Sequence, residues 1–194
     1  MAALLEGRHG PVAARRQLLE NGPPLQIQKA TSIQSSPGAG PRHLCFSSNG
    51  KYLYVIEELT GSISVYRFYK GIASFLQKVV THPKTFKGVA ASADIHLSPD
   101  GLYLYASNRG NENNIVSFKV LPNGKLEEKT IQYTSTEGKA PRNFTISKDG
   151  NWLLAANQDS NNIIAFIQHV IRPSRHVDNR TWFEQIRIKL CSFI

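Results

Sequence analysis

The feature that most constrains the fold of this chain is an internal repeat of about 50 residues. Three segments align on the glycines Gly50, Gly101 and Gly150. Each segment reads as a strand, an Asn-Gly or Asp-Gly turn, a second strand, a short polar turn and a third strand. Such dipeptides predict tight two-residue hairpins, in which both central residues adopt positive φ. The chain is therefore expected to repeat one small antiparallel unit.

A fourth strand is predicted in two of the units, over residues 73–80 and 125–133. The third unit, residues 142–168, has three strands, and we predict no fourth strand in the tail that follows it. Residues 25–33 read as the last strand of a preceding unit. Second strands such as residues 52–55 are apolar on both faces, as expected for a sheet packed between two others. These features predict an all-β fold, an incomplete β-propeller of about three four-stranded blades.

The chain of 194 residues divides into three predicted parts. Residues 1–24 form an N-terminal appendage that we expect to be poorly ordered, residues 25–168 form the partial propeller, and residues 169–194 form a divergent tail. The net charge of +9 comes from scattered lysines and arginines with no run of four, so no nucleic-acid-binding stripe is predicted.

Cysteine usage and hydropathy limit the setting of the protein. Cys45 and Cys191 lie far apart and form no CxxC pair, which favours a reducing compartment and predicts a cytoplasmic location. No apolar run approaches the roughly 18 residues of a membrane span, so no membrane association is predicted.

The hairpin register locates a candidate site. If each turn is centred on its glycine, residues eight positions to either side face each other at the open end of the hairpin. In the three units these offsets give Arg42 with Glu58, Ala93 with Arg109, and Arg142 with Gln158. The second offset reads Glu, Arg and Gln in the three units, and such varied charged and polar residues at one geometric position indicate a functional rim. A plain cross-strand ion pair between Arg42 and Glu58 is the alternative interpretation.

The histidines show neither HxxxH nor HExxH spacing, so no metal site is predicted. His43, which follows Arg42 directly, is the one histidine that we place among the candidate site residues.

Three stretches carry a family resemblance: GPRH from Gly40, SNRG from Ser107, and the pair PRNF and ANQDS from Pro141 and Ala156. With their surroundings they resemble the lactonase-type seven-bladed propellers. That family includes bacterial-type 6-phosphogluconolactonases and fungal carboxymuconate-lactonising enzymes. The resemblance spans about residues 25–168 and implies that this chain holds about three of seven blades.

The resemblance also implies roles for the rim residues. Glu58, Arg42 and Arg109 are the implied catalytic residues, and Arg142, His43 and Gln158 are assigned to substrate binding. Glu58 would act as the general base or orient one, Arg42 would stabilise the oxyanion, and Arg109 would grip a phosphate, with Arg142 as the second choice. A further histidine of the family pattern belongs to an earlier blade that this chain does not contain.

The function implied is hydrolysis of a small anionic sugar lactone, 6-phosphoglucono-δ-lactone, in the pentose phosphate pathway of carbohydrate metabolism, without a cofactor. The alternatives are lactone formation from a muconate-type diacid and a non-catalytic binding module. Because three blades cannot close a ring, we expect a fragment or short isoform with weak or no activity and with self-association through exposed blade edges.

Overall fold

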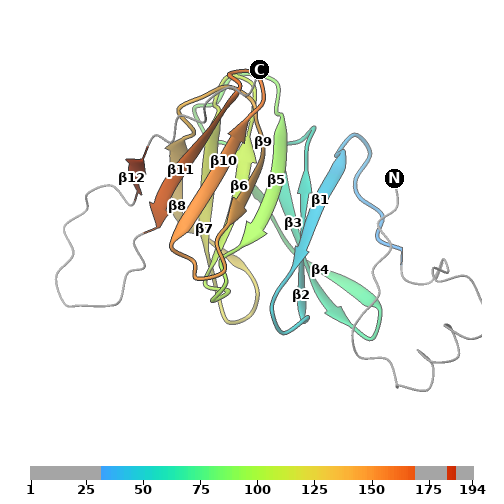
Figure 1. Cartoon of the computed structure of the whole chain (residues 1–194). Coiled ribbons are helices and arrows are strands. Elements are labelled where there is room, and N and C mark those ends of the chain that lie inside the picture. Colours follow the sequence, from blue (N-terminus) through green and yellow to red (C-terminus); the bar gives the residue numbers. More distant parts are fainter. Residues whose placement is uncertain (1–31, 169–182, 187–194) are drawn as a thin grey trace, which may run out of the picture.

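The computed structural model describes residues 32–168 and 183–186, in which the regular structure is entirely β-strand (Figure 1). The strands form three four-stranded antiparallel sheets that follow one another along the chain. The first sheet comprises β1 (Pro41–Phe46), β2 (Tyr52–Glu57), β3 (Ser62–Tyr69) and β4 (Ile72–Val80). The second comprises β5 (Ser92–Leu97), β6 (Tyr103–Asn108), β7 (Asn114–Val120) and β8 (Leu126–Ser135). The third comprises β9 (Pro141–Ile146), β10 (Trp152–Asn157), β11 (Asn162–Gln168) and β12 (Phe183–Ile186).

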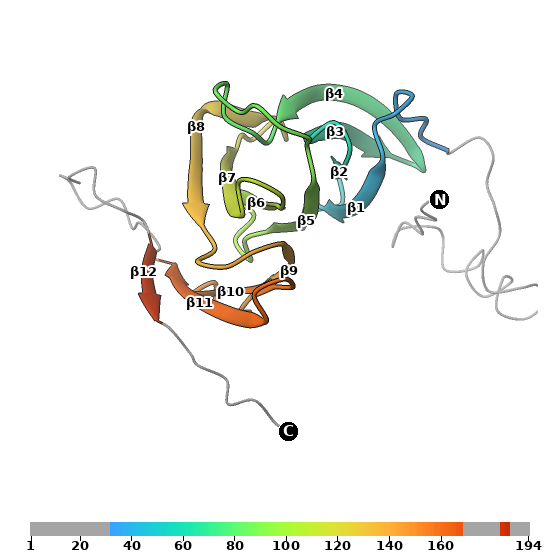
Figure 2. The same ribbon diagram turned by 90° about the horizontal axis from the view of Figure 1, so that it is seen from above.

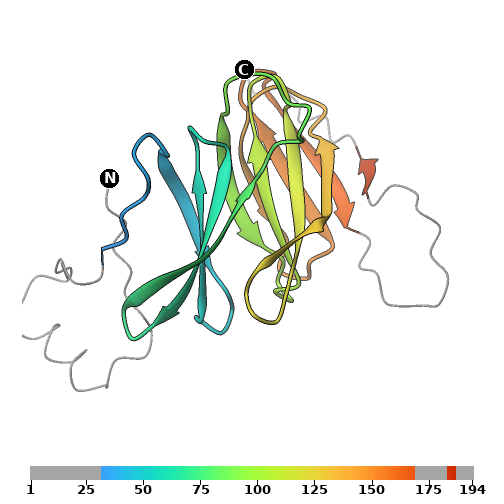
Figure 3. The ribbon, with the colours of Figure 1, turned by 180° about the vertical axis from the view of Figure 1, so that it is seen from behind.

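The first strands of the three sheets are neighbours. β1 contacts β5, and β5 contacts β9. Figure 2 shows these three strands next to one another, with β4, β8 and β12 along the outer margin of the assembly. Seen from behind, the sheets stand one beside the next in chain order (Figure 3). This is how propeller blades surround an axis, so the predicted all-β, partial propeller is confirmed.

The third blade is more complete than predicted. Residues 183–186 form β12, which pairs antiparallel with β11 through partners such as Ala165 and Ile186. The prediction of no fourth strand after Gln168 is therefore wrong. The error arises because the segment Phe183–Ile186 is short and follows an insertion, whereas the fourth strands β4 and β8 follow their third strands closely. The rest of the predicted tail and the appendage of residues 1–24 lie outside the described residues.

The glycine turns are also wider than the predicted two-residue hairpins. In the first blade, the Gly50 N–H donates to the Ser47 carbonyl at 2.8 Å, and the Ser47 N–H donates to the Tyr52 carbonyl at 2.9 Å. Gly50 has a φ of 67°, whereas Asn49 is not left-handed. The Asn49 side chain instead accepts a hydrogen bond from Ser47 Oγ at 2.8 Å. Such a four-residue loop needs left-handed backbone at the glycine alone, so the turn was placed correctly and its type was not.

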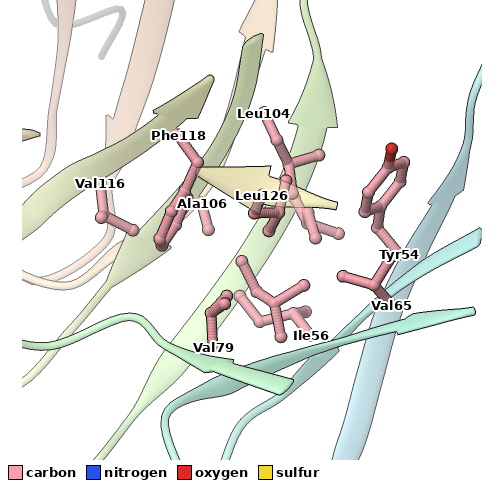
Figure 4. Packing of buried hydrophobic residues seen from close by; sticks show 11 residues of the cluster. Tyr54, Ile56, Val65, Val79, Leu104, Ala106, Val116, Phe118 and Leu126 are labelled. Carbon is pink, nitrogen blue, oxygen red and sulfur yellow. The ribbon is translucent and has the colours of Figure 1, made fainter. Parts of the chain in front are cut away.

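The core lies between blades. One buried cluster joins the first and second blades through side chains that include Tyr54, Ile56, Leu104 and Phe118 (Figure 4). A second cluster, which includes Phe144, joins the second and third blades. Burying a side chain of this size stabilises the fold by about 1.5–3 kcal/mol, so each blade depends on the next. The second strands of the first two blades, β2 and β6, bury both faces, as predicted. The second strand of the third blade, β10, buries one face and leaves Trp152 and Leu154 partly exposed on the other, so the prediction is wrong for this strand.

Hydrogen bonds from buried asparagine side chains join successive blades at one end. The Asn108 side chain, at the end of β6, donates from Nδ2 to the carbonyl of Thr81 at 2.8 Å. Thr81 directly follows β4, so the bond joins the second blade to the first. Asn157, at the end of β10, bonds the carbonyl of Thr136 at 3.0 Å in the same way. These buried amides fix the angle between neighbouring sheets at the end where the charged residues gather.

The strand predicted over residues 25–33 falls almost wholly outside the described residues. Ser32 and Ile33 are described and belong to no strand. Ile33 packs beside the buried side chains Leu53, Val55 and Tyr66, on the face of the first blade that points away from the second. Across residues 32–168 and 183–186, a search for a helix long and apolar enough to cross a membrane finds none.

Candidate functional site

Each inner strand is irregular near its first residues. In β1 the pairing passes from Pro41↔Glu57 to His43↔Ile56, which leaves Arg42 in a bulge. A similar shift in β9 falls at Arg142. In β5 the shift falls between Ser92 and Ile95. Bulges turn side chains away from the regular alternation and are common beside active sites. Here they occur at the same place in all three blades.

Because of the bulge in β1, the predicted strand register of Arg42 and Glu58 is wrong, but the predicted contact between their side chains exists. Glu58 lies beyond the end of β2, and its N–H donates to the Gly40 carbonyl at 2.8 Å, so Glu58 is not the strand partner of Arg42. The two side chains nevertheless meet, with 3.6 Å between Arg42 Nε and Glu58 Oε2. Gly40 has a φ of 65°, and a Cβ at this position would lie 2.6 Å from Leu59 Cγ. The glycine of the GPRH stretch is therefore required by the backbone that presents Arg42 and Glu58.

Arg109 of the second blade completes an ion-pair triad with Glu58 and Arg42. Its Nη2 donates to Glu58 Oε1, while its Nε donates to the Ala91 carbonyl at 3.3 Å. Glu58 therefore holds one guanidinium on each carboxylate oxygen, one from its own blade and one from the next. The plain cross-strand ion pair considered above does not describe an arrangement that spans two blades.

Arg142 and Gln158 form a separate pair on the third blade. Arg142 Nη1 donates to Gln158 Oε1 at 3.1 Å, and both side chains are exposed. Burial lowers the pKa of Arg42, and repulsion by Arg109 and Arg142 lowers this pKa further. Attraction to the carboxylates of Glu58 and Asp94 acts in the opposite direction and raises the pKa of Arg42. Arg42 therefore lies within the electrostatic reach of two other arginines. Its Nη1 is buried and has no hydrogen-bond partner.

Asp94 is the site residue that sequence reasoning missed. Its side chain is 1% exposed and sits beside the triad on the first strand of the second blade. Four donors form hydrogen bonds with its carboxylate: His96 Nε2 at 3.1 Å, Asn143 Nδ2 at 2.6 Å, and the N–H groups of Phe144 at 3.1 Å and Ile95 at 2.9 Å. His43 Nδ1 makes an ion-pair contact with the same carboxylate at 3.0 Å. Asp94 thereby joins the inner strands of all three blades.

These donors also hold Asp94 ionised. Burial alone raises the pKa of Asp94, but the hydrogen bond from His96, attraction to the His96 ring and the N–H groups of Phe144 and Ile95 outweigh it, and the pKa is lowered. The offset rule passed over Asp94 because it selected the neighbouring Ala93. The available signal was the Asp94–His96 spacing, since residues two apart on a strand share a face.

The structure thus brings Arg42, Glu58 and Arg109 into contact and places His43 on the Asp94 carboxylate. Arg142 and Gln158 lie at the same end of the third blade, paired with each other rather than with Glu58. Within the described part of the chain, no three His, Cys, Asp or Glu residues are arranged to hold a metal ion.

The fold defines a class of protein, the β-propellers, and in this chain the first strand of each blade carries charged or polar side chains at one end. The family described as lactonase, 7-bladed beta-propeller, matches residues 19–170, and the chain belongs to this family. The resemblance inferred from the sequence is thereby confirmed.

Individual relatives agree with this assignment. The chain is 48% identical over 148 residues to a 6-phosphogluconolactonase of Formosa agariphila, covering 75% of this chain and 41% of that protein. It is 37% identical to a 6-phosphogluconolactonase of Klebsiella pneumoniae, covering 73% and 43%. The structure of the periplasmic gluconolactonase of Pseudomonas aeruginosa superposes with a TM-score of 0.71 at 35% identity, covering 79% of this chain and 42% of that one. The chain therefore spans about two-fifths of the length of these relatives.

Proposed function

We propose that this site hydrolyses a sugar lactone, and that the substrate is 6-phosphoglucono-δ-lactone. The observation that carries the proposal is the unpaired Nη1 of Arg42, a buried cationic donor beside two further arginines. A buried donor without a partner is costly, and an anionic oxygen would satisfy it. The relatives named 6-phosphogluconolactonase and gluconolactonase support the choice of a lactone as the substrate class.

The proposed roles follow from the contacts. Arg42 stabilises the oxyanion that develops on the lactone carbonyl, because its free N–H lies in a buried, cationic position. Glu58 orients the two guanidiniums that it binds, a role that differs from the two expected from the sequence, in which Glu58 is the general base or orients one. Arg109 and Arg142 grip the phosphate, for which the guanidinium fork is well suited. Gln158 and His43 complete the substrate-binding surface.

A lactone is an activated ester, so its hydrolysis requires a positioned water, a proton acceptor and a stabilised oxyanion. No cofactor is needed for this chemistry. In the complete protein we place the activity in the pentose phosphate pathway and in the cytoplasm. Western blotting of separated cell fractions tests the location, and recovery with a periplasmic or membrane fraction would contradict it.

The test of the function is hydrolysis of 6-phosphoglucono-δ-lactone, measured above the spontaneous rate, by the whole chain and by Arg42→Gln. The variant removes the proposed oxyanion donor and should lower kcat by about 10²–10³-fold, the cost of one such donor. A matched control is Arg67→Gln, an exposed arginine on β3 outside the site. Equal rates for Arg42→Gln and the wild type would contradict the assignment.

The number of arginines favours one second candidate, the lactonisation of a muconate-type diacid, whose two carboxylates would need several cations. Incubation with each substrate class and analysis of the products separates the two activities. If the chain shows no turnover and does not bind 6-phosphogluconate, the third interpretation is left, a non-catalytic binding module.

A further inference from the structure

We propose that His43, held by the buried carboxylate of Asp94, is the proton-transfer residue of this site. This inference rests on the proposed lactone hydrolysis and assigns to His43 a role beyond substrate binding. Asp94 is then a positioning residue, because it acts through the imidazole rather than on the substrate.

The ion-pair contact between the two residues indicates which ring nitrogen is available. His43 Nδ1 lies 3.0 Å from Asp94 Oδ1, and this short distance favours the tautomer that carries its proton on Nδ1, facing the carboxylate. Nε2, the nitrogen farthest from the main chain, is then unprotonated and can accept a proton. The His43 side chain is 42% exposed, so water reaches the ring, whereas the Asp94 side chain is 1% exposed and accepts hydrogen bonds from four other donors. A buried carboxylate that orients an imidazole is a general device for making histidine an effective base.

Neither of the other titratable groups of the site serves as well. Glu58 Oε1 accepts a hydrogen bond from Arg109, and Oε2 lies 3.6 Å from the Arg42 guanidinium. Two adjacent cations favour the ionised carboxylate, which makes Glu58 a weak proton acceptor. His96 uses its distal Nε2 to bind Asp94, so its remaining nitrogen is the one nearer the strand. The His96 ring is also packed edge-on against Phe144, with 4.8 Å between ring centroids. His43 alone combines an oriented ring with an accessible distal nitrogen.

The proposed step balances without a co-reactant. His43 Nε2 takes a proton from water as the water oxygen bonds to the lactone carbonyl carbon, and the carbonyl electron pair moves to the oxygen that Arg42 stabilises. The tetrahedral intermediate then re-forms the carbonyl and breaks the bond to the ring oxygen. The protonated His43 returns the proton to that ring oxygen, and the open-chain hydroxy acid leaves. Arg42 precedes His43 in the chain, and the influence of Asp94 on the pKa of Arg42 indicates that the two functions lie side by side.

The first test is structural and does not depend on turnover. Long-range ¹H–¹⁵N NMR of the whole chain, with His43→Asn used to assign the resonance, should show neutral His43 with its proton on Nδ1. In Asp94→Asn this preference should disappear. A neutral wild-type ring protonated on Nε2 would overturn the proposal, and His43→Asn remains informative if Asp94→Asn does not fold.

The second test is kinetic. In hydrolysis of 6-phosphoglucono-δ-lactone, His43→Asn should lower kcat by about 10²–10⁴-fold with little change in KM, and imidazole added to the buffer should restore part of the rate. His96→Asn, which leaves the His43–Asp94 contact in place, should lower kcat by less than about tenfold.

The outcomes separate this proposal from the one on which it rests. Wild-type turnover that persists unchanged in His43→Asn would overturn the role of His43 and leave lactone hydrolysis standing. No wild-type turnover above the spontaneous rate would overturn lactone hydrolysis, and the role of His43 in it as well.

Discussion

At the scale of single residues, Glu58 is the point on which the arginine arrangement depends. It binds Arg42 at 3.6 Å and also binds Arg109, which joins two blades through one carboxylate. The sequence predicted the Arg42–Glu58 contact from an offset rule whose register was wrong. The contact exists because the bulge at Arg42 moves the side chain toward Glu58.

Replacement of Glu58 by Gln should therefore disturb two guanidiniums together. We expect Glu58→Gln to lower lactone hydrolysis by about 10²–10³-fold, the size of effect seen when oxyanion-stabilising groups are lost. Gln158→Glu is a useful companion, because it adds a carboxylate beside Arg142 without touching Glu58. Full activity of Glu58→Gln would remove Glu58 from the mechanism.

Two buried carboxylates should make the protein sensitive to acid. Burial alone raises the pKa of Glu57, but hydrogen bonds from Lys78, Ser62 and Ser64 outweigh it, and the pKa of Glu57 is lowered. The pKa of Asp94 is lowered in the same way by its own hydrogen bonds. A carboxyl group with a lower pKa in the folded state stabilises the protein above its unfolded pKa of about 4. This stabilisation is lost as the pH falls through the lower, folded-state pKa.

We accordingly expect the free energy of unfolding in urea to decrease below about pH 5. Asp94→Asn should lower it by about 1.5–3 kcal/mol at pH 7, since a charged hydrogen-bond acceptor is lost, and should weaken the dependence on pH. Fluorescence of Trp152 during urea unfolding measures both effects. An unchanged pH dependence in Asp94→Asn would show that Asp94 is not a source of the acid sensitivity.

At the scale of elements, the joints between blades depend on buried amides rather than on hydrophobic contact alone. Asn108 donates to Thr81 and Asn114 and accepts from Ser92 Oγ at 2.8 Å. The first blade has Glu57 in the equivalent place, bound to Lys78 at 2.7 Å. The first and second blades therefore share the same glycine turns but differ in the residue at the end of the second strand.

Truncation of Asn108 should loosen the joint between the first and second blades. We expect Asn108→Ala to lower the free energy of unfolding by at least about 2 kcal/mol, because buried partners lose their hydrogen bonds. Asn151→Ala, at an exposed turn, should cost less than about 0.5 kcal/mol. Thermal unfolding followed by circular dichroism compares the two variants. Equal stabilities would contradict the structural importance of the Asn108–Thr81 hydrogen bond.

At the scale of the whole molecule, three blades form an arc rather than a ring. The far face of the third blade carries half-exposed apolar side chains, among them Trp152 and Leu154, and Ile163 is 36% exposed. Beside this open arc we expect the proposed site to be more hydrated than in a closed propeller and its electrostatic effects to be weaker in the higher dielectric.

We therefore expect residues 1–194 to hydrolyse 6-phosphoglucono-δ-lactone at least about 10²-fold more slowly than a complete seven-bladed relative, a loss comparable to that of one preorganised donor. We also expect self-association through the open faces. Kinetics combined with size-exclusion chromatography and light scattering tests both. A stable monomer with the full rate of a complete relative would contradict this expectation, and an active dimer would indicate that two arcs complete one ring.

The sequence by itself determined the repeat, the strands of the first two blades, the loops at the glycines and the rim that carries Arg42 and Glu58. These follow from strand alternation and turn chemistry, which act between residues close together in the chain. Only the tertiary structure decided the bulged register, the Arg109–Glu58 ion pair, the donors around Asp94 and the pairing of β12. Each of these depends on how one sheet is placed against the next or on a strand that returns after an insertion. No local pattern encodes that placement, because it is set by packing between blades whose equivalent residues lie about 50 positions apart.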